Sequence, residues 1–201
     1  MRVTKAQAQA NRARIVETAS TLFRERGYDG VGVADLMAAA GFTHGGFYKH
    51  FGSKAELMAE AAASGLSQSL ANTDGLDVAE FFKLYLSREH RDARSAGCTM
   101  AALGGDAARQ SEDIKATFAA GIESTLAVLG REGAKLGDVD QRSARAKLID
   151  MLAHAVGAVV LSRSCPDDSS LSEEILKVCR KQILASLSAG RPTSVQRRSR
   201  R

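Results

Sequence analysis

This 201-residue chain contains no tryptophan, two prolines and three cysteines. The cysteines at positions 98, 165 and 179 show no Cys-x-x-Cys spacing, which argues against a disulfide framework or a zinc site and fits a reducing, cytoplasmic location. No run approaches the roughly 18 consecutive apolar residues of a membrane span. The N-terminus also lacks the apolar region of a secretory signal. With so few prolines and many alanines, the composition favours helices.

Positive charge is distributed unevenly along the chain, whose formal net charge is +5. Residues 191–201 carry five arginines and no acidic residue, so basic and acidic residues balance in the remainder. Within that remainder, residues 1–56 hold eight basic and five acidic residues. These counts predict a basic head on a mildly acidic body. The basic tail is expected to be disordered, with non-specific phosphate contact as the alternative.

Apolar residues recur at spacings of three and four along most of the chain, and no strand-like alternation occurs. The pattern predicts an all-α fold of about nine helices. They are expected at 5–26, 33–40, 43–50, 54–69, 78–89, 99–109, 112–136, 142–164 and 171–188, with a loop at 72–75 and a turn at 137–140. Ser53, followed three residues later by Glu56, predicts a capping box at the start of the fourth helix.

Two of these short helices meet between residues 33 and 54, where the chain reads VADLMAAAGFTHGGFYKHFGSK. The first has one apolar face and stops at Gly41, and the second begins with Thr43 as its N-cap. Two helices joined by a short turn containing glycine form a helix-turn-helix, whose second helix enters the major groove of DNA. The segment therefore predicts a DNA-binding head.

The same segment resembles the N-terminal domain of the TetR family of bacterial transcriptional repressors. The resemblance rests on the spacing Gly45-x-Phe47-Tyr48-x-His50-Phe51-x-x-Lys54, preceded by Ala40-Gly41-Phe42-Thr43. It implies a three-helix DNA-binding domain at 1–56 and a helical domain at 57–190, which binds a small-molecule inducer and dimerises through its last two long helices. The basic tail at 191–201 lies outside both domains. No cofactor and no metal is expected.

The resemblance also implies roles for single residues of the head. Phe47 and Phe51 are expected in the core, because they are large apolar groups on one helix face. Side chains with hydrogen-bond donors suit phosphate contacts, and His44 is the expected reader of base edges. The residues expected at DNA are Thr43, His44, Gly45, Gly46, Tyr48, Lys49, His50 and Lys54. Where the family usually has Thr or Ser before the second helix, this chain has Val31-Gly32 and lacks that hydroxyl.

Candidate inducer-binding residues lie on the predicted helices of the second domain. They are Phe81, Phe82, Tyr85, Met100, Leu103, Phe118, Ile122, Met151, His154 and Val160. Plain core packing is the alternative for all of them, since any buried helix has an apolar stripe. The dimer interface is expected on the helices at 142–164 and 171–188, through Ile149, Leu152, Val156, Val159, Val160, Leu176, Ile183, Leu184 and Leu187.

Cys98 stands near the predicted start of a helix, with His90, Arg91 and Arg94 close in sequence. A helix N-terminus and nearby positive charges favour a reactive thiolate. One interpretation is therefore a thiol that senses oxidants or electrophiles. The other is a small buried hydrophobic residue, which is common for free cysteine.

These observations predict a ligand-responsive transcriptional regulator. We expect a repressor that binds a palindromic operator in double-stranded DNA as a homodimer and is released by a small-molecule inducer. A repressor that senses oxidants or electrophiles through Cys98 is the alternative. An enzyme with Cys98 as nucleophile and His90 or His154 as base lacks a recognisable third group to orient the base. An architectural DNA-binding protein would depend on the basic tail.

Overall fold

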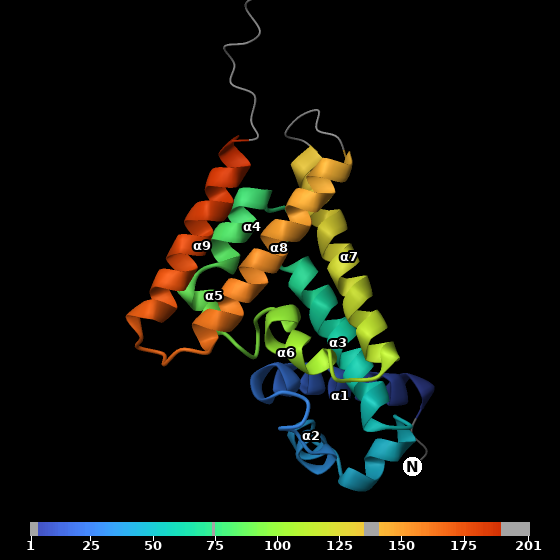
Figure 1. Cartoon of the computed structure of the whole chain (residues 1–201). Coiled ribbons are helices and arrows are strands. Elements are labelled where there is room, and N and C mark those ends of the chain that lie inside the picture. The colour runs from blue at the N-terminus through green and yellow to red at the C-terminus, as the bar shows by residue number, and fades with distance from the viewer. Residues whose placement is uncertain (1–3, 74, 135–140, 190–201) are drawn as a thin grey trace, which may run out of the picture. The chain divides into compact units, whose positions relative to one another are not determined.

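The computed structural model describes residues 4–73, 75–134 and 141–189, and every regular element in these ranges is a helix. The prediction of an all-α fold is confirmed. Residues 1–3, Asp74 of the predicted loop, the predicted turn at 137–140 and the basic tail lie outside the described residues. The elements are α1 (Lys5–Arg26), α2 (Val33–Ala39), the 3₁₀ helix η1 (His44–Lys49), α3 (Lys54–Ala71), α4 (Val78–Tyr85), α5 (Arg88–Asp92), α6 (Thr99–Ala107), α7 (Glu112–Ala134), α8 (Gln141–Arg163) and α9 (Ser170–Ala189) (Figure 1).

The chain divides into two compact units. Unit 1 comprises Met1–Asp74 and Ala93–Ser124, and therefore contains α1, α2, η1, α3, α6 and the first half of α7. Unit 2 comprises Gly75–Asp92 and Thr125–Arg201, which contain α4, α5, the rest of α7, α8 and α9.

α1 begins and ends where its local sequence dictates. The Thr4 hydroxyl accepts a hydrogen bond from the backbone N–H of Gln7 at 3.2 Å, which satisfies a donor that the helix itself leaves free. At the other end Gly27 adopts φ +74°, and its N–H donates to the carbonyl of Phe23 at 2.8 Å. Since this φ is costly for any residue with a Cβ, glycine is the natural stop.

One apolar cluster forms the core of unit 1. α1 packs along α3, α2 packs against α1 and η1, and α6 packs against both α1 and α3. Completely or almost completely buried side chains include Ile15, Phe23, Leu36, Met37, Phe47, Phe51, Leu57 and Leu103. Each such burial contributes about 1.5–3 kcal/mol. The prediction that Phe47 and Phe51 are core residues is confirmed, and their rings stack with centroids 5.5 Å apart.

Unit 2 is built around the pairing of α8 with α9, which run side by side from the connection at 164–169 (Figure 1). α4 packs against α9, and α5 packs against α8. The buried apolar residues include Phe82, Leu86, Met151, Leu152, Val159, Leu176 and Ile183.

The single helix expected at 78–89 is wrong, because α4 ends at Tyr85 and α5 begins at Arg88. The residues after the break make polar contacts that a continuous helix would prevent, because it would turn their side chains and backbone groups in other directions. The Nδ1–H of the His90 ring donates to the carbonyl of Tyr85 across 2.6 Å, and the backbone N–H of His90 donates to the Ser87 hydroxyl at 3.1 Å.

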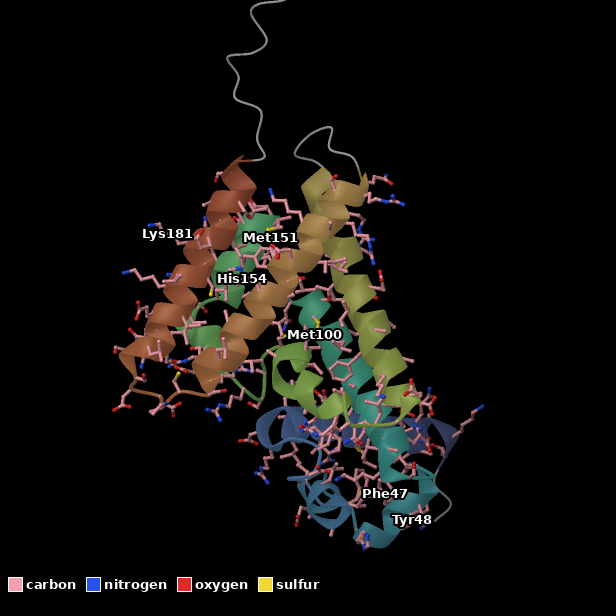
Figure 2. All side chains as sticks on the ribbon, in the orientation of Figure 1. Phe47, Tyr48, Met100, Met151, His154 and Lys181 are labelled. Carbon is pink, nitrogen blue, oxygen red and sulfur yellow. The ribbon has the colours of Figure 1, made fainter. Side chains whose placement is uncertain are left out.

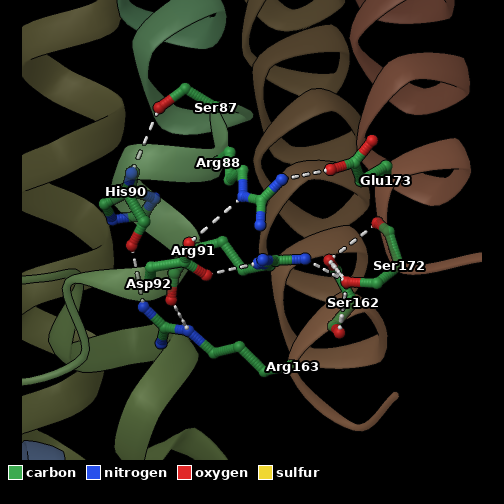
Figure 3. Close-up of polar contacts among 9 residues, drawn as sticks. All are labelled: Ser87, Arg88, His90, Arg91, Asp92, Ser162, Arg163, Ser172 and Glu173. Atoms are coloured by element: carbon green, nitrogen blue, oxygen red, sulfur yellow. Dashed lines mark hydrogen bonds and ion pairs between the residues drawn. The ribbon is translucent and has the colours of Figure 1, made fainter. Parts of the chain in front are cut away.

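Arg91 and Arg163 join the broken segment to the long helices (Figure 3). The buried guanidinium of Arg91 donates to the hydroxyl of Ser172 on α9 and to a carboxylate oxygen of Asp92, the latter at 2.6 Å. Arg163 on α8 donates to the carbonyls of Arg91 and His90 at 2.8 and 3.0 Å. Tertiary contacts therefore outweigh the local helical pattern at this point.

Candidate nucleic-acid interface

The helix-turn-helix consists of α2, a tight turn and η1. Gly41 in the turn has φ +80°, a left-handed backbone conformation that glycine adopts without strain. Thr43 occupies the N-cap position of η1, but its side chain makes no capping hydrogen bond and is exposed. Its carbonyl accepts from the N–H of Gly46 at 2.9 Å, and that of Phe47 accepts from His50 at 2.9 Å. Two adjacent glycines have low helix propensity, which accounts for a 3₁₀ helix instead of an α-helix.

Adjacent aromatic residues of η1 point to opposite sides. Phe47 is 1% exposed, whereas Tyr48 is 70% exposed, and their rings meet edge to face with centroids 5.2 Å apart. Figure 2 shows both labelled residues at the end of unit 1 that α2 and η1 form. Because Phe47 is fixed in the core, the phenol beside it is presented from a rigid base.

The other predicted DNA contacts lie on or beside the same segment. Thr43, His44, Gly45 and Lys49 are exposed, and Gly46, His50 and Lys54 are half-buried. A Cβ atom added to Gly45 would meet no atom within 4 Å, and one added to Gly46 would make only ordinary contacts of 3.6 and 3.7 Å. Neither glycine has a positive φ. The folded chain itself therefore has no need of glycine at either position.

Lys54, the first residue of α3, is held by the loop between α1 and α2. Its ammonium donates to the carbonyl of Tyr28 at 2.6 Å and lies 5.9 Å from the centroid of the Phe23 ring. The helix start beside it differs from the predicted capping box. The Ser53 hydroxyl accepts from the N–H of Glu56 at 3.1 Å, but the Glu56 carboxylate accepts from Gly52 at 2.7 Å instead of Ser53.

Two arginines of α1 belong to the same end of the unit and were absent from the sequence prediction. Arg12 pairs with Glu56 at 2.8 Å and with Glu60, and its guanidinium lies 4.2 Å from the centroid of the Phe51 ring. The hydrogen bond from Arg12 lowers the pKa of Glu56. Arg14 is exposed beside the Gly41 turn, with its guanidinium 5.6 Å from the Phe42 ring centroid. Their basic character was visible in the sequence, but their position beside the turn was not.

A further acidic residue reaches this loop from α6. One carboxylate oxygen of Asp106 accepts from the backbone N–H of Tyr28 at 3.2 Å. The other oxygen pairs with Arg109 at 2.9 Å. No local pattern indicates this contact, because Asp106 and Tyr28 are far apart along the chain.

Cys98 is buried at the N-cap of α6, and its side chain makes no capping hydrogen bond. Arg24 interacts with it electrostatically, which raises the pKa of the guanidinium against the larger lowering effect of burial. The buried Arg24 also donates to the Ser95 carbonyl at 2.7 Å and to the Ser20 hydroxyl at 2.6 Å. The pattern of apolar and basic residues in α1 does not by itself show that the side chain of Arg24 is buried.

The predicted inducer-binding residues are distributed over both units. In unit 1, Met100, Leu103 and Phe118 are buried and Ile122 is exposed, and Leu103 and Phe118 share the core cluster. In unit 2, Phe82, Tyr85 and Met151 are buried, whereas His154 is exposed on α8 (Figure 2).

No group of three His, Cys, Asp or Glu side chains among the described residues could hold a metal ion. Within the same ranges, no helix is both long and apolar enough to span a bilayer.

Residues 15–61 match the family described as bacterial regulatory proteins, tetR family. The HTH-type transcriptional regulator TtgR of Pseudomonas putida is 45% identical over 58 residues, which are 29% of this chain and 28% of TtgR. YdgC of Bacillus subtilis, an uncharacterized HTH-type transcriptional regulator, is 23% identical over 189 residues, covering 87% of this chain and 93% of YdgC. The match to TtgR thus spans less than a third of that relative.

Solved structures of low identity share the whole fold. A transcriptional regulator from Cytophaga hutchinsonii superposes with a TM-score of 0.74 at 15% identity, over 96% of this chain and 100% of the other. AibR, solved in complex with isovaleryl coenzyme A and operator DNA, superposes with a TM-score of 0.58 at 17% identity, over 87% and 98%.

Proposed function

Because the chain belongs, through the DNA-binding domain at residues 15–61, to the TetR family of bacterial regulatory proteins, we propose that it is a ligand-responsive repressor of transcription. The observation that carries the proposal is the contrast within η1. A buried Phe47 anchors a segment whose remaining side chains, Tyr48 foremost, are turned to solvent. Such a segment offers donors to DNA at little cost in conformational entropy.

In this proposal each residue of the segment has a distinct task. Thr43, His44 and Lys49 face base edges, and Gly45 and Gly46 let the groove approach the backbone. Tyr48, His50 and Lys54 donate to phosphates, which fixes the position of η1 on the duplex. Residues 1–56 act as the DNA-binding domain and 57–190 as the effector and dimerisation domain.

The proposed repressor is a homodimer joined through α8 and α9. Leu152, Val159, Leu176 and Ile183 are already buried within the single chain, so other residues must form the interface. Large apolar side chains exposed on the two helices are Ile149, Val160, Leu161, Leu171 and Val178. Ile149 and Val160 are eleven residues apart in sequence, about three helical turns, and therefore share one face of α8. Two-fold symmetry then matches a palindromic operator.

We further propose that an inducer releases the operator, acting through its differential affinity for two arrangements of the dimer. The candidate contacts are Phe82, Tyr85, Met100, Leu103, Phe118, Ile122, Met151 and His154. AibR, the structural neighbour with bound isovaleryl coenzyme A and operator DNA, gives precedent for both kinds of ligand on this fold. A regulator of this kind acts on the bacterial chromosome, so its proposed location is the cytoplasm, and no catalytic step is assigned to it.

Selection from a random double-stranded DNA library tests this function. The protein should enrich a palindrome with half-sites about one helical turn apart. Tyr48→Ala and Lys49→Ala should weaken binding to that fragment at least tenfold. Lys181→Ala is the matched control, since it removes an exposed lysine of α9 and should leave affinity unchanged. Enrichment of no sequence, or equal effects of the three substitutions, would overturn the proposal.

The second candidate is a thiol-sensing repressor, and the observation in its favour is the thiol of Cys98 at the N-cap of α6, which interacts electrostatically with Arg24. In this scheme the sulfur of Cys98 attacks peroxide and forms a sulfenic acid, while the leaving hydroxide takes up a proton to become water. Peroxide should then release the operator from the parent protein but not from Cys98→Ser. Cys165→Ser serves as control. Equal release from parent and Cys98→Ser excludes this mechanism.

A further inference from the structure

The backbone of Tyr28 lies between two charged side chains of unit 1. Asp106 of α6 accepts from its N–H at 3.2 Å, and Lys54 of α3 donates to its carbonyl at 2.6 Å. Tyr28 is 1% exposed, so the loss of either partner leaves one of its backbone groups without its hydrogen bond. The backbone of one residue thus links α6 to the first residue of the helix that follows η1.

Gly27 lies directly against the carboxylate of Asp106. A Cβ atom at this position would lie 2.9 Å from a carboxylate oxygen of Asp106. The carboxylate itself is oriented, because its second oxygen pairs with Arg109 at 2.9 Å. Both oxygens therefore have a defined partner, and the acceptor presented to Tyr28 is fixed in direction.

The two hydrogen bonds hold the two amide groups on either side of the Tyr28 Cα atom. Asp106 accepts from the amide that joins Gly27 to Tyr28, and Lys54 donates to the amide that joins Tyr28 to Asp29, so together they restrain the backbone of one residue. The Lys54 ammonium keeps two further protons for other acceptors. A lysine already held in place gives up less rotamer freedom when it binds a phosphate than a free lysine does.

We propose that Asp106 is a positioning residue for DNA binding, acting through the backbone of Tyr28 on the Lys54 ammonium. The inference rests on the proposed function and extends the DNA-binding machinery to a residue of α6, outside the matched domain at 15–61. Asp106 touches no DNA in this scheme. It fixes the N–H of the residue whose carbonyl holds the phosphate-binding lysine.

The experiment measures affinity for the fragment selected by the parent protein, at several salt concentrations. Each phosphate neutralised contributes about 0.9 to the slope of log K against log salt, so Lys54→Met should lower its magnitude by roughly two for a dimer. Asp106→Ala should weaken binding about two- to tenfold and lower the slope in the same direction. Asp106→Asn keeps an acceptor oxygen for the Tyr28 N–H and should restore most of the affinity.

Two controls separate positioning from a general loss of structure. Tyr28→Phe removes a buried hydroxyl and leaves both backbone hydrogen bonds of this residue in place, so its slope should equal the parent's. The decisive comparison adds Asp106→Ala to Lys54→Met, where it should cause no further change in slope or affinity. Equal effects of Asp106→Ala with and without Lys54 would overturn the inference, as would an unchanged slope in Asp106→Ala. If the parent protein selects no DNA fragment, the proposed function is refuted. If Lys54→Met changes the slope and Asp106→Ala does not, only the role of Asp106 is refuted.

Discussion

Replacement of Gly45 by alanine should raise the stability of the protein and weaken its binding to DNA. The position is open, because an added Cβ would meet no atom within 4 Å, and its φ is not in the left-handed region. Alanine then restricts the unfolded chain without straining the folded one, which stabilises by about 0.4–1 kcal/mol. For a protein of this length the midpoint of thermal unfolding should rise by about 1–4 °C.

The same methyl group should interfere with DNA. It would stand on the exposed side of η1, where the proposed function brings the edges of the groove against the backbone. We expect the affinity of Gly45→Ala for the selected operator to fall at least tenfold, or about 1.4 kcal/mol. Thermal unfolding followed by circular dichroism and fluorescence anisotropy with labelled operator measure the two effects on one sample.

Gly104 provides the matched control for this substitution. It lies in α6 of the same unit, and a Cβ there would also meet no atom within 4 Å. Gly104→Ala should therefore bring the same gain in stability with unchanged operator affinity. Parent-like binding by Gly45→Ala would refute the close approach of DNA at this position. A fall in its stability would refute the open geometry of η1.

Three further predictions test other parts of the structure. Gly65→Ala should lower the free energy of unfolding by about 1–3 kcal/mol, because the added Cβ would lie 2.5 Å from both the Arg24 guanidinium and the Thr99 hydroxyl. A urea titration measures this change, and an unchanged free energy of unfolding would contradict this packing. Burial lowers the pKa of His90 below its usual 6.5, so its stabilising contribution is complete above that pH and is lost as the pH falls from there towards the lower folded pKa. Unfolding free energies at pH 7.5 and 5.5 should therefore differ less in His90→Gln than in the parent, and an equal difference would argue against this sign. Removal of residues 190–201 should lower affinity for all DNA sequences alike and leave the palindrome preferred, whereas an architectural DNA-binding protein would lose binding altogether.

The sequence predicted elements whose ends are encoded locally. α1 has the predicted bounds because Thr4 and Gly27 act on backbone groups within four residues of themselves. The break between α4 and α5 was not predictable in this way. It depends on Arg163 and Ser172, which reach the segment from helices far along the chain.

The candidate DNA-binding site also combines features that are encoded locally with features that depend on tertiary contacts. Helical spacing separated the core residues Phe47 and Phe51 from the solvent-facing Tyr48, and burial agrees. The neighbours that hold Lys54 could not be found from spacing, since Tyr28 and Asp106 come from a loop and a later helix. Local pattern identifies which side chains face outwards, whereas their support comes from contacts that only folding creates.

The fold does not require a glycine at either of the two glycine positions of η1. Most changes in a protein core must be compatible with a narrow margin of stability, and that margin restricts how fast such positions diverge. Residues 45 and 46 escape this restriction, because small side chains fit there without displacing a neighbour. Duplicated genes for such a regulator could therefore acquire separate operators through one or two substitutions at these sites, with the rest of the chain unchanged.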